Sequence, residues 1–333
     1  MSTSTQSKPY KIYNQSCYGL EGISDDSIDA IITDPPYGIG FQAHEWDKAL
    51  PERQIWKDCY RVLKPGGYAL VFSSIRLMHH LMLDLEKSGF RIKDVLMWAF
   101  LNGMPKSRDV GLDIDKELEV ESTKVGTYNY VQGYKKGGAD NYYAGKKKYR
   151  YEPASEEGKY YQGWGMGIKP CYEPIIMVQK PLPNGVNVAQ NMLEHGTGAL
   201  NLEDTRMPYE EGEGKVGHNP HSKGRVTGNV LRTFPFKDGY DKFFLVPKVR
   251  QHAEEYNYHP TKKPVELMEH LIKLITHEKS TVLDPFTGSG STGVACVYLH
   301  RSFVGYEMDK GYSEIAKNRL LAAYKGGKQQ DMF

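Results

Sequence analysis

The tetrapeptide Asp34-Pro35-Pro36-Tyr37 combines groups that are suited to holding an amine. Two consecutive prolines remove two N–H donors and restrict the backbone, which leaves a stiff turn with carbonyl acceptors, one carboxylate and one aromatic ring. The Asp34 carboxylate and the Pro35 carbonyl can accept hydrogen bonds from an exocyclic amine while Tyr37 stacks on the attached ring. A rigid loop without a chemical role is the alternative interpretation. The position of the turn after a predicted buried strand favours the functional one.

A glycine-rich segment between a predicted strand and a predicted helix carries a second chemical signal. Gly288, Gly290 and Gly293 match the spacing GxGxxG, and Glu307 ends the next strand 19 positions after Gly288. An acid at that place can bind the hydroxyl groups of a ribose. The pattern therefore predicts a cofactor that contains adenosine. By itself it fits a nicotinamide dinucleotide as well as S-adenosylmethionine.

The segment from His259 to Pro264 stands just before the helix that leads into the glycine-rich region. A proline is well suited to the first turn of a helix, so the segment also reads as a helix start. A lysine fixed at this point, Lys263, can neutralise the carboxylate of a methionine moiety. A dinucleotide has no such group, so the lysine favours S-adenosylmethionine.

Alternating strands and helices must position these groups. In the first third the sequence predicts strands Ile28–Thr33, Tyr68–Ser73 and Val95–Phe100 and helices Pro51–Leu63 and Leu77–Lys87. Near the end it predicts helices Pro264–Thr276, Gly293–Leu299 and Tyr312–Ala323 and strands Thr281–Leu283 and Phe303–Tyr306. This alternation predicts an α/β fold with a doubly wound, mostly parallel sheet. Its halves are expected at residues 8–105 and 256–325, on either side of an irregular insertion, residues 106–255.

The insertion is rich in glycine, tyrosine and lysine. Residues 124–150 hold seven basic side chains against the single acid Asp140, and six tyrosines stand among them. Cations can pair with phosphates, and aromatic rings can stack on exposed bases. We therefore predict a DNA-binding surface, with phosphate contacts from Lys135, Lys136, Lys146, Lys147 and Lys148. A solvated charged loop is the alternative.

Composition narrows the class of protein further. The chain has 333 residues, a formal net charge of +2 and 39% hydrophobic residues, and no apolar run approaches the roughly 18 residues of a membrane helix. Its four cysteines stand far apart, so neither a zinc site nor a disulfide framework is indicated, and no metal is expected. These features are typical of a cytoplasmic protein with reduced thiols.

Taken in order, these motifs resemble the β class of DNA amino-methyltransferases, and the middle segments Lys169–Ile176 and Gly196–Asn201 resemble a phage-type branch. The resemblance implies a Rossmann-like methyltransferase fold with a circularly permuted motif order, and S-adenosylmethionine as cofactor. It implies a catalytic role for Asp34, Pro35, Pro36 and Tyr37. It implies cofactor binding by His259, Thr261, Lys263, Asp284, Phe286, Gly288, Ser289, Gly290 and Glu307. One departure is Ser16, which stands where many relatives carry an acid.

The activity that the resemblance implies is methyl transfer to N6 of an adenine that has left the stack of double-stranded DNA. N4 of cytosine is the first alternative, because Asp-Pro-Pro-Tyr favours adenine in this family without fixing it. A methyltransferase for RNA or for protein glutamine is a second, and a nicotinamide-dependent dehydrogenase is a more distant one. The dehydrogenase leaves Asp34–Tyr37 and Lys263 without a role. A homodimer and a cognate restriction endonuclease stay open as partners.

Overall fold

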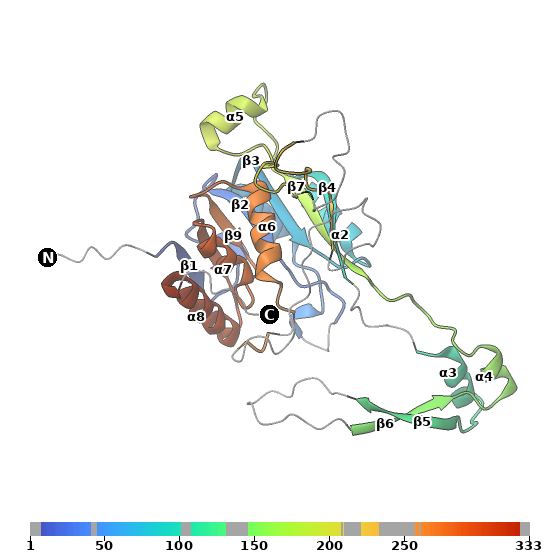
Figure 1. The fold of residues 1–333 in the computed structure, drawn as a ribbon. Helices are drawn as coiled ribbons and strands as arrows, with labels where there is room; N and C mark the ends of the chain where they lie inside the picture. Colours follow the sequence, from blue (N-terminus) through green and yellow to red (C-terminus); the bar gives the residue numbers. More distant parts are fainter. Residues whose placement is uncertain are drawn as a thin grey trace. The chain divides into compact units, whose positions relative to one another are not determined.

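The computed structural model describes residues 8–40, 45–100, 108–130, 146–207, 209, 221–232, 257–259 and 261–326 (Figure 1). The chain divides into two compact units. The larger unit consists of Met1–Leu101 and Tyr172–Phe333, and the smaller one of Asn102–Cys171. The predicted catalytic and cofactor segments all belong to the larger unit.

An eight-stranded sheet, in the order β1-β10-β9-β2-β3-β7-β4-β8, forms the centre of the larger unit as far as it is described. Its strands are β1 (Tyr10–Tyr13), β2 (Ile28–Thr33), β3 (Leu63–Phe72), β4 (Arg91–Ala99), β7 (Tyr172–Gln179), β8 (Val230–Arg232), β9 (Thr281–Asp284) and β10 (Ser302–Tyr306). Among these strands β7 alone runs antiparallel to its neighbours. The prediction of a mostly parallel sheet is therefore confirmed.

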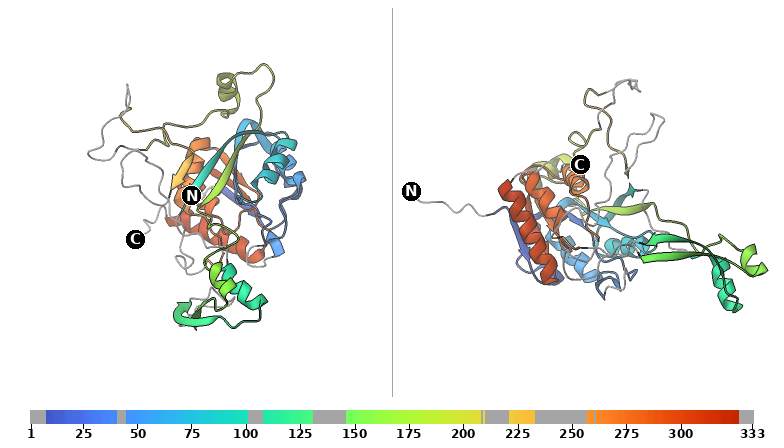
Figure 2. Two further views of the ribbon diagram at one scale, coloured as in Figure 1. Left: turned by 90° about the vertical axis from the view of Figure 1, so that its right-hand side faces the viewer. Right: turned by 60° about the horizontal axis from the view of Figure 1, so that its bottom comes forward.

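Helices cover both faces of this sheet, and Figure 2 shows the orange and red helices of the C-terminal part together on one of them. The first face carries α6 (Val265–Ile275), α7 (Ser291–Tyr298) and α8 (Lys310–Gly326), and the second carries α1 (Arg53–Val62) and α2 (Met78–Lys87). The sheet is thus doubly wound, as the alternation predicts.

The alternation of side chains along each strand explains the two cores. Ala30 and Ile32 pack in the cluster under α6 and α7, while Ile31 packs in the cluster under α1 and α2. All three are fully buried. A parallel strand that is covered on both faces is apolar throughout, and this is why the run Ile28–Thr33 was recognisable in the sequence.

The predicted insertion, residues 106–255, is not a single irregular region. Its segment Tyr172–Gln179 forms β7, which lies between β3 and β4 in the main sheet (Figure 1). The side chains of Ile175, Ile176, Met177 and Val178 are buried there. Burial of this apolar run between two strands draws the segment into the larger unit, so the separate unit ends at Cys171.

Another part of the predicted insertion packs on the start of β3. Helix α5 (Val188–His195) begins with a capping box formed by Asn187 and Gln190. The buried Asn191 donates hydrogen bonds to the carbonyl oxygens of Pro65 (2.9 Å) and Thr197 (2.7 Å). A Cβ on Gly66 would lie 2.6 Å from the Asn191 amide nitrogen, so this contact requires glycine.

The smaller unit contains the antiparallel pair β5 (Thr123–Tyr130) and β6 (Lys146–Glu152) and the helices α3 (Val110–Glu117) and α4 (Glu156–Tyr160). The buried Asp115 of α3 accepts hydrogen bonds from the backbone N–H groups of Ala154 (2.7 Å) and Ser155 (3.1 Å). This carboxylate therefore ties α3 to the segment that joins β6 and α4. In the described part of both units, every helix is too short or too polar to cross a membrane.

Candidate active site

The turn Asp34–Tyr37 follows β2 at the carboxyl end of the strand, as predicted. The Tyr37 hydroxyl donates a hydrogen bond of 2.7 Å to Oδ1 of Asp34. The ammonium group of Lys263 donates to the other oxygen, Oδ2. Both oxygens of the predicted catalytic carboxylate thus accept a hydrogen bond from a residue of the site.

Lys263 lies between two carboxylates. Besides its contact with Asp34, its Nζ atom is 3.4 Å from Oε2 of Glu173 and 3.4 Å from the Tyr37 hydroxyl. Its side chain is only 8% exposed, and the ammonium lies 4.9 Å from the centre of the Phe72 ring. The structure therefore brings the lysine of the His259–Pro264 segment directly to the catalytic turn. Its predicted contact with a methionine carboxylate stays a prediction.

Glu173 was not among the predicted site residues. It is the second residue of β7, and the antiparallel direction of that strand places its amino end where the parallel strands have their carboxyl ends. Glu173 pairs in register with Trp98 of β4. Its Oε2 atom lies 3.5 Å from the Tyr37 hydroxyl. The sequence places Glu173 in a segment that resembles the phage-type branch, but nothing in its spacing pointed to the catalytic turn.

Burial and charge shift the proton affinities of this cluster. Burial raises the pKa of the Asp34 carboxyl, Glu173 raises it further, and Lys263 opposes the rise. Burial lowers the pKa of the Lys263 ammonium, but the two carboxylates outweigh it and hold that pKa above its ordinary value. Burial also raises the pKa of Tyr37 well above its usual range. With Lys263 charged, Asp34 and Glu173 leave the cluster with one excess negative charge when both are ionised.

A second acid outside the predicted set fixes the backbone of the turn. Asp47 is 1% exposed, and its Oδ1 atom accepts hydrogen bonds from the N–H groups of Tyr37 (2.6 Å) and Gly38 (3.0 Å). The carbonyl oxygen of Asp47 accepts a further one from the N–H of Gly40 (2.8 Å). Two consecutive prolines leave the turn few backbone donors, and Asp47 binds the first two that follow them.

The glycine-rich segment begins with a buried acid that joins it to β2. Oδ1 of Asp284 accepts hydrogen bonds from the Thr33 hydroxyl (2.6 Å) and from the N–H of Phe286 (3.1 Å). Oδ2 accepts one from the Thr292 hydroxyl (2.8 Å). Burial raises the pKa of Asp284 to about 6. The predicted cofactor residues Asp284 and Phe286 are therefore neighbours of the catalytic strand, with the Phe286 ring 6.2 Å from that of Trp56.

Glu307 and Gly288, predicted as a ribose-binding acid and a loop glycine, are in direct contact. Oε2 of Glu307 accepts a hydrogen bond of 2.8 Å from the N–H of Gly288, and Oε1 accepts one of 2.7 Å from the N–H of Asp309. Burial raises the pKa of Glu307 to about 7. A carboxylate oxygen has more than one lone pair, so both oxygens can still accept hydroxyl groups.

The loop glycines match the requirements of a close backbone approach. Gly288 has φ +53° and Gly290 has φ +84°, values that favour glycine. A Cβ on Gly288 would lie 2.9 Å from Nε2 of His259. His259 itself stacks edge to face on Tyr312 at 4.5 Å, and its Nδ1 accepts a hydrogen bond from the N–H of Thr261 (3.4 Å). His259 thus lies against the loop that it was predicted to serve.

The remaining loop position, Ser289, contacts helix α8. Its carbonyl oxygen accepts a hydrogen bond of 2.7 Å from Arg319, which also lies 3.4 Å from the Ser291 hydroxyl. Together the glycine loop, the Glu307 carboxylate and His259 form a set of groups that fits the adenosine half of S-adenosylmethionine. The hydrogen bond between Thr33 and Asp284 connects this set to the turn at Asp34, which Lys263 contacts.

The predicted DNA-binding lysines belong to the smaller unit or lie outside the described residues. Lys135 and Lys136 are in the second group. Lys146, Lys147 and Lys148 lie on β6, a regular strand within the insertion that was predicted to be irregular, and Lys148 is exposed. Ser16, where relatives carry an acid, is exposed and accepts a hydrogen bond from the N–H of Tyr18 (3.2 Å).

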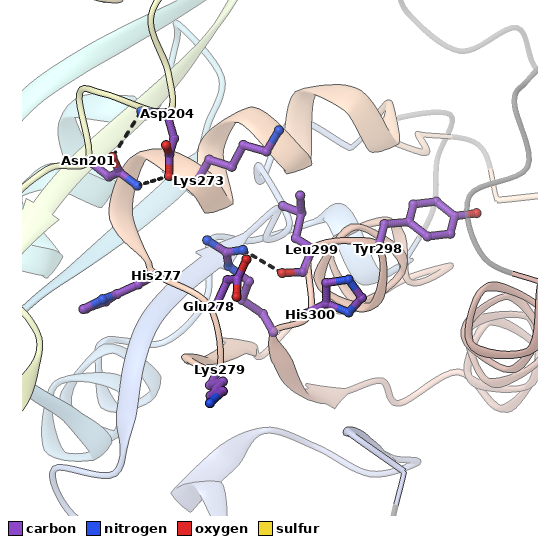
Figure 3. A pocket seen from close by; sticks show the side chains of 10 residues that line it. Asn201, Asp204, Lys273, His277, Glu278, Lys279, Tyr298, Leu299 and His300 are labelled. Atoms are coloured by element: carbon purple, nitrogen blue, oxygen red, sulfur yellow. Dashed lines mark hydrogen bonds between the residues drawn. The ribbon is translucent and has the colours of Figure 1, made fainter.

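A pocket of about 730 Å³ lies near the amino ends of β9 and β10 (Figure 3). Its lining residues include Lys279 and Arg301, which stand just before the amino ends of β9 and β10. The catalytic turn and Glu307 lie at the carboxyl ends of their strands. The Arg301 guanidinium donates a hydrogen bond of 2.6 Å to the Leu299 carbonyl oxygen. The pocket is therefore separate from the chemical groups described above.

Three of the four cysteines lie in the core of the larger unit. Cys59 and Cys296 are buried, and burial raises the pKa of both well above the usual range. Among the described residues, no group of three or more His, Cys, Asp or Glu side chains is arranged to hold a metal ion.

Comparison with known proteins gives consistent matches over most of the chain. A family model described as "DNA methylase" matches residues 28–318. The chain is 48% identical to the type II methyltransferase M2.LlaDCHI of Lactococcus lactis subsp. cremoris, over 90% of this chain and 85% of that protein. It is 24% identical to the DNA adenine methyltransferase YhdJ of Escherichia coli, over 94% of this chain and 82% of the relative.

A solved structure supports the fold in particular. The PvuII DNA methyltransferase, described as cytosine-N4-specific, superposes with a TM-score of 0.51 at 14% identity, covering 97% of this chain and 88% of that one. At this identity the likeness concerns the arrangement of the sheet and its helices. It agrees with the Rossmann-like fold that the motifs predict.

Proposed function

The chain belongs to the DNA methylase family, whose members modify exocyclic N6 or N4 amino groups with S-adenosylmethionine as cofactor, and we propose that its own target is N6 of adenine in double-stranded DNA. The observation that carries the proposal is the Asp34 carboxylate at the end of β2, beside the glycine loop that is linked to it through Thr33 and Asp284. An acceptor suited to an amine, next to groups that fit the methyl donor, supports the proposal.

The choice of adenine has two supports. The catalytic turn begins with Asp34 and not with a serine, and in this family the aspartate form favours adenine. The relative YhdJ, which is named as a DNA adenine methyltransferase, covers nearly the whole chain. N4 of cytosine is the competing target, and the experiment below distinguishes the two.

The proposed chemistry is a direct transfer. Bound S-adenosylmethionine supplies a methyl group on a sulfonium, which is a good leaving group. Asp34 and the Pro35 carbonyl hold the N–H groups of the target amine so that the nitrogen lone pair points at the methyl carbon. The cofactor would give up its methyl group to the nitrogen and keep the S–C electron pair, and Asp34 would accept the N–H proton that the nitrogen loses. Alignment and electrostatics then supply most of the rate, and no covalent enzyme intermediate is needed.

The target base must leave the double helix to reach this turn, which costs a few kcal/mol. The exposed hairpin of the smaller unit is our candidate for the DNA contacts that offset part of this cost. Its Lys148 and Arg150 are exposed, as are Tyr128, Tyr149 and Tyr151. Cations on such a surface pair with phosphates and position the protein without reading the sequence. The homodimer and the cognate restriction endonuclease stay predictions.

The experiment that tests the target is an analysis of the modified nucleoside. The purified protein is incubated with S-adenosylmethionine and unmethylated genomic DNA. The DNA is then digested to nucleosides, which are separated by chromatography and identified by mass spectrometry. We expect N6-methyladenine, and none in a parallel reaction with Asp34→Asn. N4-methylcytosine as the product would replace the adenine assignment. The absence of any methylated nucleoside, with the cofactor bound, would overturn the proposal.

A further inference from the structure

We infer that Glu173 is a positioning residue of this site. It accepts hydrogen bonds from the Tyr37 hydroxyl and the Lys263 ammonium when these turn away from Asp34, and so leaves the Asp34 carboxylate available to the target amine. The inference rests on the proposed function, because it assigns a step in holding the amine. It concerns a residue that the sequence motifs do not single out. Its basis is the set of contacts around Asp34.

Both oxygens of Asp34 already accept a hydrogen bond. The Tyr37 hydroxyl donates to Oδ1 at 2.7 Å, and the Lys263 ammonium donates to Oδ2. An amine that approaches Asp34 must compete with these donors for an oxygen. A turn that is to hold the amine firmly therefore needs another acceptor to which at least one donor can move.

Glu173 provides that acceptor for both donors through a single atom. Its Oε2 is 3.4 Å from Nζ of Lys263 and 3.5 Å from the Tyr37 hydroxyl. These are long contacts, and a charge-assisted hydrogen bond to a carboxylate is shortest at about 2.7–2.9 Å, so a shift of well under 1 Å strengthens either one. Glu173 is 19% exposed and Lys263 8% exposed, so solvent screens this exchange only weakly.

The charge of Glu173 makes it favourable for Lys263 to move from Asp34 to Glu173 during the reaction. A buried ammonium that lost its only carboxylate would be left uncompensated, which costs several kcal/mol. With Glu173 in place, Lys263 keeps a carboxylate partner while Asp34 turns to the amine. Glu173 also raises the pKa of Asp34, so its charge sets how readily Asp34 holds a proton.

The fold explains why the acceptor comes from β7. The parallel strands have their carboxyl ends beside the turn and their amino ends on the opposite side of the sheet. A residue near the amino end of a strand can therefore lie beside the turn only if that strand is antiparallel, as β7 is. The register of β7 with β3 is fixed from Phe72↔Ile175 onward, and the N–H of Ser73 donates to the Pro174 carbonyl oxygen at 3.0 Å. Glu173 is thus anchored by the residue that follows it.

The test compares Glu173→Gln with Glu173→Asp and with a matched control, Glu86→Gln, which removes an exposed carboxylate from α2. Single-turnover methylation of genomic DNA gives the rate, measured from pH 5.5 to 9. Calorimetry gives the affinity for S-adenosylhomocysteine, which also shows that each variant is folded.

For Glu173→Gln we expect a loss of about a hundredfold in the single-turnover rate, since a misplacement of 1 Å near the reacting groups can cost that much. We expect the acidic limb of the rate profile to move to lower pH, because the charge that raises the pKa of Asp34 is gone. Glu173→Asp keeps the charge and should fall between wild type and Glu173→Gln. The cofactor affinity should stay that of the wild type in both variants.

Two results would overturn the inference. One is a rate and a pH profile for Glu173→Gln that equal those of Glu86→Gln. The other is a loss of cofactor affinity that accounts for the whole loss of rate, which would make Glu173 a cofactor-binding residue. A failure of the proposed function is distinct from both, because it appears in the wild type as a product other than N6-methyladenine. The comparison of variants can then be made on that product.

Discussion

The hydroxyl of Thr33 donates a hydrogen bond of 2.6 Å to Oδ1 of Asp284, and the two residues are 251 positions apart in the chain. Thr33 ends β2 and Asp284 ends β9, which are neighbouring parallel strands. The hydrogen bond therefore joins the strand of the catalytic turn to the strand of the glycine loop. It connects the turn that is proposed to hold the amine with the loop that fits the cofactor.

Removal of this bond should weaken the fold measurably. In Thr33→Val one oxygen of the buried Asp284 loses a donor, and loss of a hydrogen bond to a buried charged group costs about 1–3 kcal/mol. We expect the free energy of unfolding in urea to fall by that amount. Thr33→Ser keeps the hydroxyl and should stay close to the wild type. Equal unfolding midpoints for all three proteins would contradict a structural role for the bond.

The pKa of Glu307 gives the cofactor affinity a pH dependence. Burial raises that pKa to about 7, above the ordinary value of a glutamate, so the folded protein holds a proton on Glu307 at pH 6 and releases it by pH 8. The carboxylate accepts ribose hydroxyls better than the neutral acid does. The dissociation constant for S-adenosylhomocysteine, measured by calorimetry, should therefore fall by up to about tenfold between pH 6 and pH 8.

The same group has the opposite effect on stability. Because the pKa is higher in the folded state than in the unfolded one, its contribution to stability falls as the pH rises from about 4.3 to about 7. In Glu307→Gln both effects should disappear, leaving a weaker affinity that is equal at pH 6 and pH 8. A pH dependence that persists in this variant would assign the titration to another group.

Asp47 should affect both the stability of the protein and the rate of methyl transfer, because its carboxylate binds the backbone of the turn. Asp47→Ala leaves the buried N–H groups of Tyr37 and Gly38 without the carboxylate that binds them. We expect a loss of stability of about 1.5–3 kcal/mol for each charge-assisted bond and a slower methyl transfer. Asp47→Asn keeps an acceptor oxygen and should recover part of both. Stability and rate of Asp47→Ala equal to those of the wild type would show that the prolines alone fix the turn.

The register of the hairpin sharpens the prediction for DNA. Lys148 and Arg150 are two positions apart on β6, so they share one face, and Tyr128 is the partner of Lys148 in register. Lys148→Gln combined with Arg150→Gln should weaken binding to all duplexes about equally and flatten the salt dependence by about 0.9 log unit per lost phosphate contact.

The matched control for this prediction removes two charges from the helices of the same unit. Lys116→Gln with Lys159→Gln changes two exposed lysines of α3 and α4. Binding is measured from low to moderate salt on a cognate and a scrambled duplex. An identical loss of slope in both double variants would attribute the effect to net charge, and an unchanged slope in the hairpin variant would move the DNA surface elsewhere.

Much of the sheet could be predicted because buried parallel strands leave a clear trace in the sequence. The apolar run Ile28–Thr33 became β2 with the same bounds. The predicted helix Pro264–Thr276 is α6, Val265–Ile275, with apolar residues at helical spacing. The glycine spacing and Glu307 also lie where a strand, a loop and a helix were expected, because their backbone requirements fix the residue types.

The irregular start of β3 and the short strand β7 could not be predicted from the sequence. Strand β3 begins at Leu63 and not at Tyr68, since its first residues pass through a bulge opposite Ile28 and Ala30. The core of β7 is a run of only four apolar residues in a region rich in glycine, tyrosine and lysine. A run of that length does not distinguish a strand from a short helix.

The two acids that complete the site were equally hidden. Asp47 lies 10 positions from Tyr37, and Glu173 lies 136 positions from it. Neither has a spacing that marks it, because a carboxylate that binds a backbone N–H or a lysine needs only the right place in space. Sequence motifs thus predicted the candidate reacting groups, and the fold was needed to find the side chains that contact them.

The measurement that tests the central claim most directly compares two quantities in Asp34→Asn. One is the single-turnover rate of methyl transfer to DNA, and the other is the affinity for S-adenosylmethionine in calorimetry. Asp34 is proposed to hold the target amine, so we expect the rate to fall by about a hundred- to a thousandfold or more. The cofactor should bind as in the wild type and as in Asp25→Asn, an exposed control carboxylate. Near-wild-type methylation by Asp34→Asn would contradict the account, and so would a loss of cofactor binding that matches the loss of rate.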